Sequence, residues 1–492
     1  MRRPLVTVTL LLVVWGTPRV GAQEMNYNTF QVGSRSSLMG GAVVGGVRDT
    51  SAAFYNPGAL GFVANPDISV SANAFRFGKV TIADALGPGE DATATLLDPI
   101  PLLVSGILPW PAAPQWAFGY ALVARQLYTA TFTHAVDTPR EALNVGGVSL
   151  PLPTQFLAQS NITSRANEFW AMGAMAWRPS ATLALGLAPI VALRRQSLIE
   201  RFAIQTIPRG DGVTMPIGGN AFTDIDFDQF SLGTRFGVAW EPHARLKVGA
   251  TLTTPNLKLV SSGSSQAQVT VNNIPVLTNG SIQGFQSLAG SDFQEGLSAH
   301  YRTPLSIAVG AEVTPWTPLT VGLTVDYSVA LGRRALLDVQ GGRPFFRGPG
   351  TEGRPDSTAF LTPLDERRTV VNVSVGAAYA LNETYAAYVG FWTDFSPLTR
   401  HQVTEILRSN QGVVLATGEV DLYHVVFGAT RTTQRSTVAV GVGLSHGTGS
   451  APSNVDITPT GDVLGLTQGG RVIARDVSFW SLSLLLGYTY YF

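Results

Sequence analysis

One stretch of the sequence has the spacing of a serine nucleophile, because Gly443-Leu444-Ser445-His446-Gly447 matches G-x-S-x-G. In hydrolases this motif needs a strand, a sharp turn and then a helix, which together expose the serine oxygen. Here the motif ends an alternating segment and continues into Thr448-Gly449-Ser450, with no helical pattern after it. We therefore interpret the match as fortuitous and expect no enzymatic activity, although a hydrolase that uses Ser445 stays an alternative.

The other reactive residue types form no recognisable cofactor or metal site. The chain has no cysteine, which excludes disulfides, thiolate metal ligands and cysteine nucleophiles. Its six histidines show no metal-binding spacing such as H-E-x-x-H. The glycine pairs Gly40-Gly41 and Gly45-Gly46 lack the Lys-Ser/Thr of a phosphate-binding loop. We expect neither a cofactor nor a bound metal.

The composition contains fewer charged residues than a water-exposed surface normally carries. Charged residues make up 13% of the 492 residues, whereas soluble proteins have about 25%. Lys+Arg and Asp+Glu both number 33 and form no basic stripe, so no nucleic-acid partner is expected. With 45% hydrophobic residues the chain is not disordered. These values favour a membrane protein.

The N-terminus has the features of a secretory signal peptide. Arg2 and Arg3 precede the apolar run Leu5–Val14, and Val20-Gly21-Ala22 supplies small residues for cleavage after Ala22. The run is shorter than the roughly 18 residues that a spanning helix needs, so a membrane anchor is the weaker alternative. No later apolar run approaches that length. A chain of this kind can span a bilayer only as a closed β-barrel.

Alternation of apolar with small or polar residues supports a barrel. In the C-terminal segment one face carries Trp480, Leu482, Leu484, Leu486, Tyr488, Tyr490 and Phe492, and the other face is mostly small or polar. Aromatic residues at both ends of the apolar strip are typical of membrane interfaces. Fourteen such segments can be delimited, near 66–78, 100–109, 115–132, 160–177, 181–202, 227–241, 244–271, 295–314, 318–337, 366–381, 383–397, 421–433, 435–449 and 475–492.

The connections between these segments alternate between short turns and long loops. That asymmetry is typical of outer-membrane barrels, whose periplasmic turns are short and whose external loops are long. The sequence therefore predicts an all-β fold, a 14-stranded antiparallel transmembrane β-barrel over 66–492 in the bacterial outer membrane, after a signal peptide over 1–22. Both termini of the mature chain would be periplasmic.

Residues 23–65 precede the first strand and do not alternate. They are rich in glycine and small residues, and a 14-stranded barrel leaves an open channel unless something fills it. We predict that they form an N-terminal hatch, or plug, in the lumen.

This segment resembles the hatch of the FadL/TodX-type outer-membrane transporters of long-chain fatty acids and other hydrophobic compounds. The family pattern is a glycine-rich stretch, an acidic residue, small residues and Asn-Pro-Ala, which here reads Gly40-Gly41-Ala42, Asp49, Ser51-Ala52-Ala53 and Asn56-Pro57-Gly58. Glycine at 58 departs from the usual alanine. Later stretches, Tyr301–Ser306 and Tyr385–Pro397, also look like strands of the family.

The resemblance implies passive transport of hydrophobic small molecules. Loops would capture the ligand, the lumen would bind it, and movement of the hatch would release it. Expected partners are the ligand, outer-membrane lipid and lipopolysaccharide, and the outer-membrane insertion machinery that reads the C-terminal strand. An assembly or secretion partner, or a general porin, stays an alternative function for the same fold.

Two groups of residues are candidate ligand contacts. Arg125 and Arg235 face inward by strand parity and could bind a carboxylate, although pairing with inward acids such as Glu312 or Asp326 is an alternative. Apolar residues expected in two long loops could capture ligand or pack the loops together: Ile204, Ile207, Val213, Met215, Ile217 and Phe222 in one, and Phe345, Phe346 and Phe360 in the other.

Overall fold

Alternating residues place one row of side chains on each face of a strand, and this pattern builds the wall of the protein. The chain is described as a computed structural model. The predicted signal peptide over 1–22 lies outside the described residues. Those residues are 26–63, 67–85, 89–98, 102–108, 113–145, 148–150, 153–209, 215–278, 281–347, 354–399, 401, 413–414, 418–453 and 473–492.

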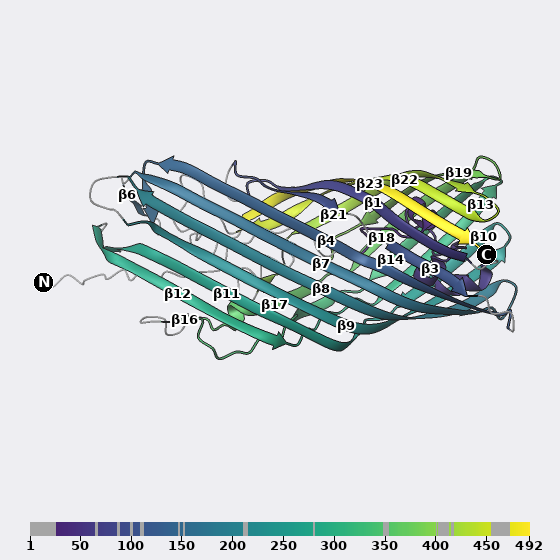
Figure 1. Cartoon of the computed structure of the whole chain (residues 1–492), viewed down its shortest axis with the longest axis horizontal. Helices are drawn as coiled ribbons and strands as arrows, with labels where there is room; N and C mark the ends of the chain where they lie inside the picture. The colour runs from purple at the N-terminus through teal and green to yellow at the C-terminus, as the bar shows by residue number, and fades with distance from the viewer. Residues whose placement is uncertain are drawn as a thin grey trace.

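One antiparallel sheet closes on itself as a barrel (Figure 1) when β1 (Asp67–Ile82) pairs with β23 (Ile473–Tyr491). The barrel has fourteen strand positions, because β2 with β3, β10 with β11, and β12 with β13 each fill one position. The predicted 14-stranded barrel is confirmed. The remaining strands of the wall are β2 (Ala92–Asp98), β3 (Leu102–Leu108), β4 (Trp116–Arg140), β7 (Thr154–Trp177), β8 (Leu183–Pro208), β9 (Ile217–His243), β10 (Leu246–Thr253), β11 (Leu257–Thr278), β12 (Ser281–Leu297), β13 (Ser306–Trp316), β14 (Leu319–Ser328), β18 (Val370–Ala380), β19 (Tyr385–Asp394), β21 (Glu419–Thr432) and β22 (Ser436–Ser453).

Short elements lie beside the wall. A small sheet contains β15 (Leu331–Ala335), β17 (Pro363–Arg367) and β20 (Val413–Val414). The others are the hairpin β5 (Leu143–Val145) with β6 (Val148–Leu150), the strand β16 (Phe346–Arg347) at the edge of β12, and the helix α3 (Thr358–Leu361). The segment expected as one strand over 318–337 is therefore two, since β15 leaves the wall.

The outward face of the wall is an apolar belt. In β23 the exposed side chains include Trp480, Leu482 and Leu486, whereas Ser481 and Thr489 on the opposite face are buried. Exposed apolar side chains recur on every strand position of the wall, which is the surface that a membrane-spanning barrel presents to lipid. Among the described residues, no helix has the length and apolar character needed to cross a membrane.

One side of the barrel extends far beyond the belt. The strands β4, β7, β8 and β9 are 25, 24, 26 and 27 residues long, whereas about 9–11 residues span a membrane. Figure 1 shows these strands, with β11 and β12, running past the shorter half of the wall, away from the end that carries the C-terminus. We call this part the extension.

The extension corrects one sequence prediction. Ile204 and Ile207 lie in β8, and Ile217 and Phe222 lie in β9, rather than in a loop. Val213 lies outside the described residues. The loop prediction failed because the alternation inverts in the extension: large apolar side chains such as Ile204 and Ile225 face the core, and the outward face is mostly polar.

The N-terminal segment 26–63, called the hatch below, packs against the inner surface of the wall. It contains α1 (Ser34–Leu38), α2 (Ala52–Tyr55) and the 3-10 helix η1 (Pro57–Phe62). Its apolar side chains share one buried cluster with wall residues of β3, β4, β7, β8 and β9. Because hatch and wall bury their side chains together, the lumen at this level is a packed interior.

Wall glycines allow the hatch backbone to approach closely. A Cβ atom on Gly310 would lie 3.0 Å from the nitrogen of Gly45, and one on Gly487 would lie 2.6 Å from Ser34 Oγ. At such distances a larger residue would force the hatch to shift. Ten wall glycines would each bring an added Cβ atom against the hatch, and we call them the glycine belt of the inner surface: Gly186, Gly237, Gly249, Gly310, Gly322, Gly376, Gly390, Gly428, Gly441 and Gly487.

Candidate functional site

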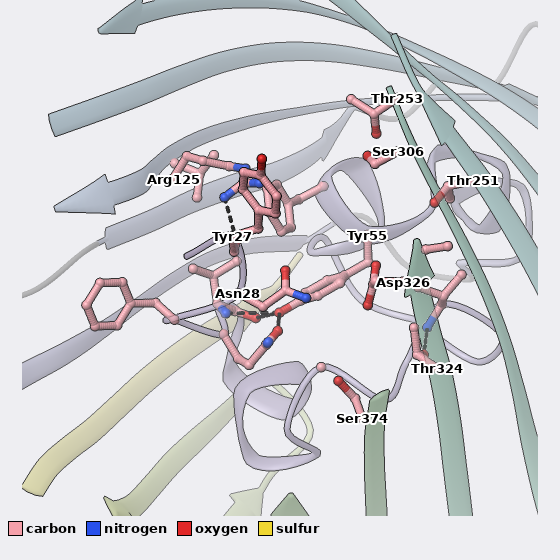
Figure 2. A pocket seen from close by; sticks show the side chains of 18 of the residues that line it. Tyr27, Asn28, Tyr55, Arg125, Thr251, Thr253, Ser306, Thr324, Asp326 and Ser374 are labelled. Atoms are coloured by element: carbon pink, nitrogen blue, oxygen red, sulfur yellow. Dashed lines mark hydrogen bonds between the residues drawn. The ribbon is translucent and has the colours of Figure 1, made fainter. Parts of the chain in front are cut away.

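A polar cavity of about 80 Å³ lies in the lumen between the hatch and the wall. Figure 2 shows Tyr27, Asn28 and Tyr55 of the hatch surrounded by wall residues such as Arg125 and Asp326. Its apolar lining includes Phe30, Val32, Val44, Phe54 and Val123, and its hydroxyl lining includes Thr251, Thr253, Ser306, Thr324, Ser328 and Ser374. The cavity therefore offers both apolar and hydrogen-bonding surface.

Arg125 reaches this cavity from an irregularity in β4. The pairing of β4 with β7 shifts between Ala124 and Gln126, so Arg125 is the extra residue of a bulge. Its Nη1 donates to the carbonyl of Tyr27 at 2.7 Å, and its guanidinium lies 5.1 Å from the Trp170 ring centroid. Among the described residues, no carboxylate forms an ion pair with Arg125.

Arg235 reaches the cavity from β9. Its Nε donates to Thr253 Oγ1 at 2.9 Å, another of its nitrogens donates to the Phe54 carbonyl, and its guanidinium lies 4.9 Å from the Phe54 ring centroid. Arg125 and Arg235 both line the cavity, as expected from strand parity.

The alternative expectation, pairing of the two arginines with inward acids, is wrong for Glu312. That carboxylate binds Arg35 at 2.6 Å and Lys247 at 3.1 Å. Asp326 lines the same cavity, but within the described part of the chain neither Arg125 nor Arg235 has an acidic oxygen within 4.0 Å. In the described part of the chain, the site thus combines two arginines with an aspartate that lies beyond ion-pair distance of both.

Residues 26–32, called the strap below, form one wall of the cavity and are held by a buried aspartate. Asp394 Oδ1 accepts from the Asn28 backbone N–H at 2.9 Å, and Oδ2 accepts from Thr29 Oγ1 at 2.7 Å. Trp392 Nε1 donates to the Asn28 carbonyl at 2.9 Å. Sequence analysis missed Asp394, whose only signal is a charged residue at an inward position at the end of β19.

Tyr55 ties the strap to the rest of the hatch. Its hydroxyl accepts from the Val32 backbone N–H at 3.0 Å and lies 3.0 Å from both Gln31 Oε1 and the Val32 carbonyl, to which it can donate. Burial raises the pKa of Tyr55. The phenol therefore stays neutral and keeps its proton for these bonds.

The predicted hatch motif Asn56-Pro57-Gly58 lies at the base of the hatch, against β8 and β9. Asn56 Oδ1 accepts from the Gly58 N–H at 3.1 Å, and Nδ2 donates to the carbonyls of Val44 and Val238, both at 2.9 Å. A Cβ atom on Gly58 would lie 2.8 Å from the Gly237 carbonyl oxygen. This close approach explains why glycine stands where the family pattern has alanine.

The aromatic candidates for ligand capture lie elsewhere. Phe345 and Phe346 are buried in a cluster with Phe360, whose ring stacks on Phe345 at 4.0 Å, so these three side chains pack the loops against the wall. Phe222 belongs to the outward-facing row of β9 and does not line the lumen cavity. None of these four phenylalanine rings therefore lines the cavity that contains Arg125 and Arg235.

Ser445 of the G-x-S-x-G match lies inside β22, which continues as a strand to Ser453. Its Oγ lies 2.7 Å from Nδ1 of His424, whose ring stacks on Trp392. Among the residues that the structure describes, His424 Nε2 is buried without a hydrogen-bond partner, so none of their carboxylates orients this histidine as in a catalytic triad. No group of three metal-ligating side chains occurs in the described ranges.

A second cavity, of about 20 Å³, lies behind the strap. His424, Ser445 and Arg76 line it, and it shares Phe30 and Gln31 with the first cavity. These two strap residues therefore separate the two cavities.

No family model and no curated protein sequence matches the chain. Several solved structures match it. A Pseudomonas aeruginosa FadL homologue is 12% identical, with 96% of this chain and 99% of that chain covered and a TM-score of 0.54. The Pseudomonas putida toluene transporter TodX is 14% identical, with 94% and 99% covered and a TM-score of 0.56. The Ralstonia pickettii toluene transporter TbuX is 12% identical, with 95% and 100% covered and a TM-score of 0.51. The chain therefore has the FadL/TodX-type fold that its hatch motif and strand pattern predicted.

Proposed function

We propose that this protein is an outer-membrane channel that passively transports hydrophobic small molecules. The proposal is supported by the apolar belt, which fits a lipid environment, and by a fold like that of a FadL homologue and of toluene transporters. A hatch that fills the lumen disfavours a general porin. In this reading the extension is external, both ends of the mature chain are periplasmic, and lipopolysaccharide surrounds the extension.

The observation that carries the proposed ligand class is the pair of arginines in the lumen cavity. Arg125 and Arg235 have no acidic partner within ion-pair distance among the described residues, while aromatic rings cover their guanidinium groups. A carboxylate bound there would gain charge-assisted hydrogen bonds in a site shielded from water. Amphiphiles with a carboxylate head and an apolar tail are therefore the proposed preferred ligands.

Transport would then require the strap to move. The strap separates the two cavities through Phe30 and Gln31, and hydrogen bonds to Asp394, Trp392, Arg125 and Tyr55 hold it in place. The body of the hatch is fixed by the glycine belt and by its buried apolar cluster. We propose that ligand binding displaces the strap, whereas the body of the hatch keeps its place.

The test is binding and uptake of a carboxylate and a neutral ligand of similar size. Arg125→Ala combined with Arg235→Ala should weaken laurate binding by roughly tenfold or more, since a hydrogen bond to a charged group contributes about 1.5–3 kcal/mol. Toluene uptake should change little. Arg195→Ala is the matched control, because Arg195 is exposed on the outer wall and pairs with Asp228. Equal losses for laurate and toluene would contradict the proposed role of the arginines, and uptake of neither by the unaltered protein would refute the transport function.

A further inference from the structure

A groove of about 500 Å³ lies on the outer face of the extension, across β4, β7, β8, β9 and β11. One row of its lining consists of register partners on successive strands: Thr133, Asn161, Arg201, Phe222 and Gln268. The neighbours of this row along each strand, such as Phe132 and Ile162, point into the core. The groove is therefore outside the barrel and separate from the lumen cavity.

Short side chains make the hollow. The adjacent row contains Ala135, Gln159, Ala203 and Asn220, again as register partners. The two alanines leave space between the longer amides beside them. Because the floor is a paired sheet, the groove is held in shape by the hydrogen bonds of the strands.

The lining has the chemistry of a saccharide site. Four carboxamides, those of Gln159, Asn161, Asn220 and Gln268, combine donors with an acceptor, as vicinal hydroxyl groups require. One donor of Asn161 is already used, because its Nδ2 donates to Thr133 Oγ1 at 3.1 Å. The Arg201 guanidinium lies 5.5 Å from the centroid of the Phe222 ring. That pair offers a planar donor fork beside an aromatic ring, which can pack against the C–H face of a hexose.

The height of the groove above the apolar belt points to its occupant. Phe230 is the last large apolar side chain of the belt on β9, and Phe222 lies eight residues beyond it, roughly 27 Å along the strand. Between them Arg195 and Asp228 form an exposed pair at 2.7 Å, so the charges near the belt satisfy each other. Because strands of such barrels tilt by about 35–45°, this separation corresponds to roughly 20 Å of height. The tails of lipids packed around the belt do not extend that far, whereas the sugar chain of a surrounding glycolipid does.

We propose that this groove binds neutral hexose units of the lipopolysaccharide that surrounds the barrel. The inference rests on the proposed outer-membrane location but not on the transport route. It assigns Phe222, considered above as a hydrophobic-ligand contact, to saccharide recognition together with Arg201. A bound sugar chain would anchor the extension in the glycolipid layer beside the external loops.

The test uses the full-length protein in detergent and the lipid-free, dephosphorylated core oligosaccharide released from rough-type lipopolysaccharide. Titration followed by saturation-transfer NMR should show saturable binding. Phe222→Leu and Arg201→Ala should each weaken it by roughly tenfold, without altering the heat-modifiable mobility that reports a folded barrel. Arg195→Ala, on the same outer wall outside the groove, should bind as the unaltered protein does.

Three results would overturn the proposal. They are the absence of saturable binding, equal binding by the Phe222→Leu variant, and binding of only the phosphorylated lipid A disaccharide. Different variants test the groove and the proposed transport function, so that each can be refuted without the other. Phe222→Leu should leave laurate uptake unchanged, whereas the combined Arg125→Ala and Arg235→Ala variant should lose laurate uptake but keep oligosaccharide binding.

Discussion

Asn56 in the hatch and Gly237 in β9 are in direct contact across the boundary between hatch and wall. A Cβ atom on Gly237 would overlap Asn56 Oδ1 and would lie 2.8 Å from the nitrogen of Gly58. One residue further along β9, the Val238 carbonyl accepts from Asn56 Nδ2 at 2.9 Å. This hydrogen bond can form because Gly237 has no side chain that would keep Asn56 away from the wall. The position of the Asn56-Pro57-Gly58 motif therefore depends on the glycine at 237.

Replacing Gly237 should therefore displace the base of the hatch. We expect Gly237→Ala to destabilise the protein by about 1–3 kcal/mol, as overpacking does, and to raise ion conductance in planar bilayers. Gly233→Ala is the matched control, because it lies in the same strand and a Cβ there would meet nothing closer than 3.9 Å. Identical stability and conductance for the two variants would show that the hatch is not held by this contact.

The small sheet beside the wall should depend on pH through Asp365. Burial alone would raise the pKa of Asp365, but Arg367 and Arg334, each 2.9 Å away, hold it below its usual value. A depressed carboxyl pKa stabilises the fold above the unfolded value of about 3.9, and this stability is lost as the pH falls through the folded value.

Hydrogen exchange of the β15 and β17 amides should reveal this effect. Protection, corrected for intrinsic exchange, should fall as the pH drops below about 4. Asp365→Asn should lower protection at neutral pH and remove that dependence. Asp338→Asn, at an exposed pair with His300, should leave the profile of these strands as it is. A profile in Asp365→Asn like that of the unaltered protein would assign the pH dependence to other groups.

The edge of the apolar belt can be located by arginine substitution. Leu323 in β14 is exposed on the lipid-facing side, so Leu323→Arg should cost roughly 2–4 kcal/mol if the site is near the midplane. Gln205→Arg, on the outward face of β8 in the extension, should cost almost nothing. Reversible unfolding in lipid vesicles measures both. A similar cost at the two sites would mean that the extension is also embedded in lipid.

The sequence predicted the barrel well because lipid imposes a strict pattern on every strand. Leu323 and Leu482 alternate with small residues, and this period-2 signal is read directly from the chain. It did not predict the length of β9 beyond Phe230, because the alternation inverts there: Asp224, Asp226 and Asp228 take the outward positions, whereas Ile225 and Phe227 face the core. It also did not predict that β15 leaves the wall, since Leu331 and Ala335 keep the parity of the apolar row of β14 and only Arg333 interrupts it.

The candidate site was predictable only in part. Strand parity placed Arg125 and Arg235 in the lumen, and the hatch motif placed Asn56 in the segment that packs there. Parity could not identify their partners, because the contact of Asp394 with Thr29 joins residues that are 365 positions apart. In the sequence the wall glycines are only small residues on the lumen-facing side of each strand. That the hatch approaches them closely is apparent only from the three-dimensional structure.

The most direct test of the transport account is to lock the strap. The chain has no native cysteine, so Thr29→Cys combined with Asp394→Cys gives a single pair at the contact where the strap meets β19. Laurate uptake should be measured in the same cells before and after oxidation, and again after reduction. The account predicts that uptake falls to background when the pair is oxidised and returns on reduction, whereas undiminished uptake with a fully formed disulfide would contradict it.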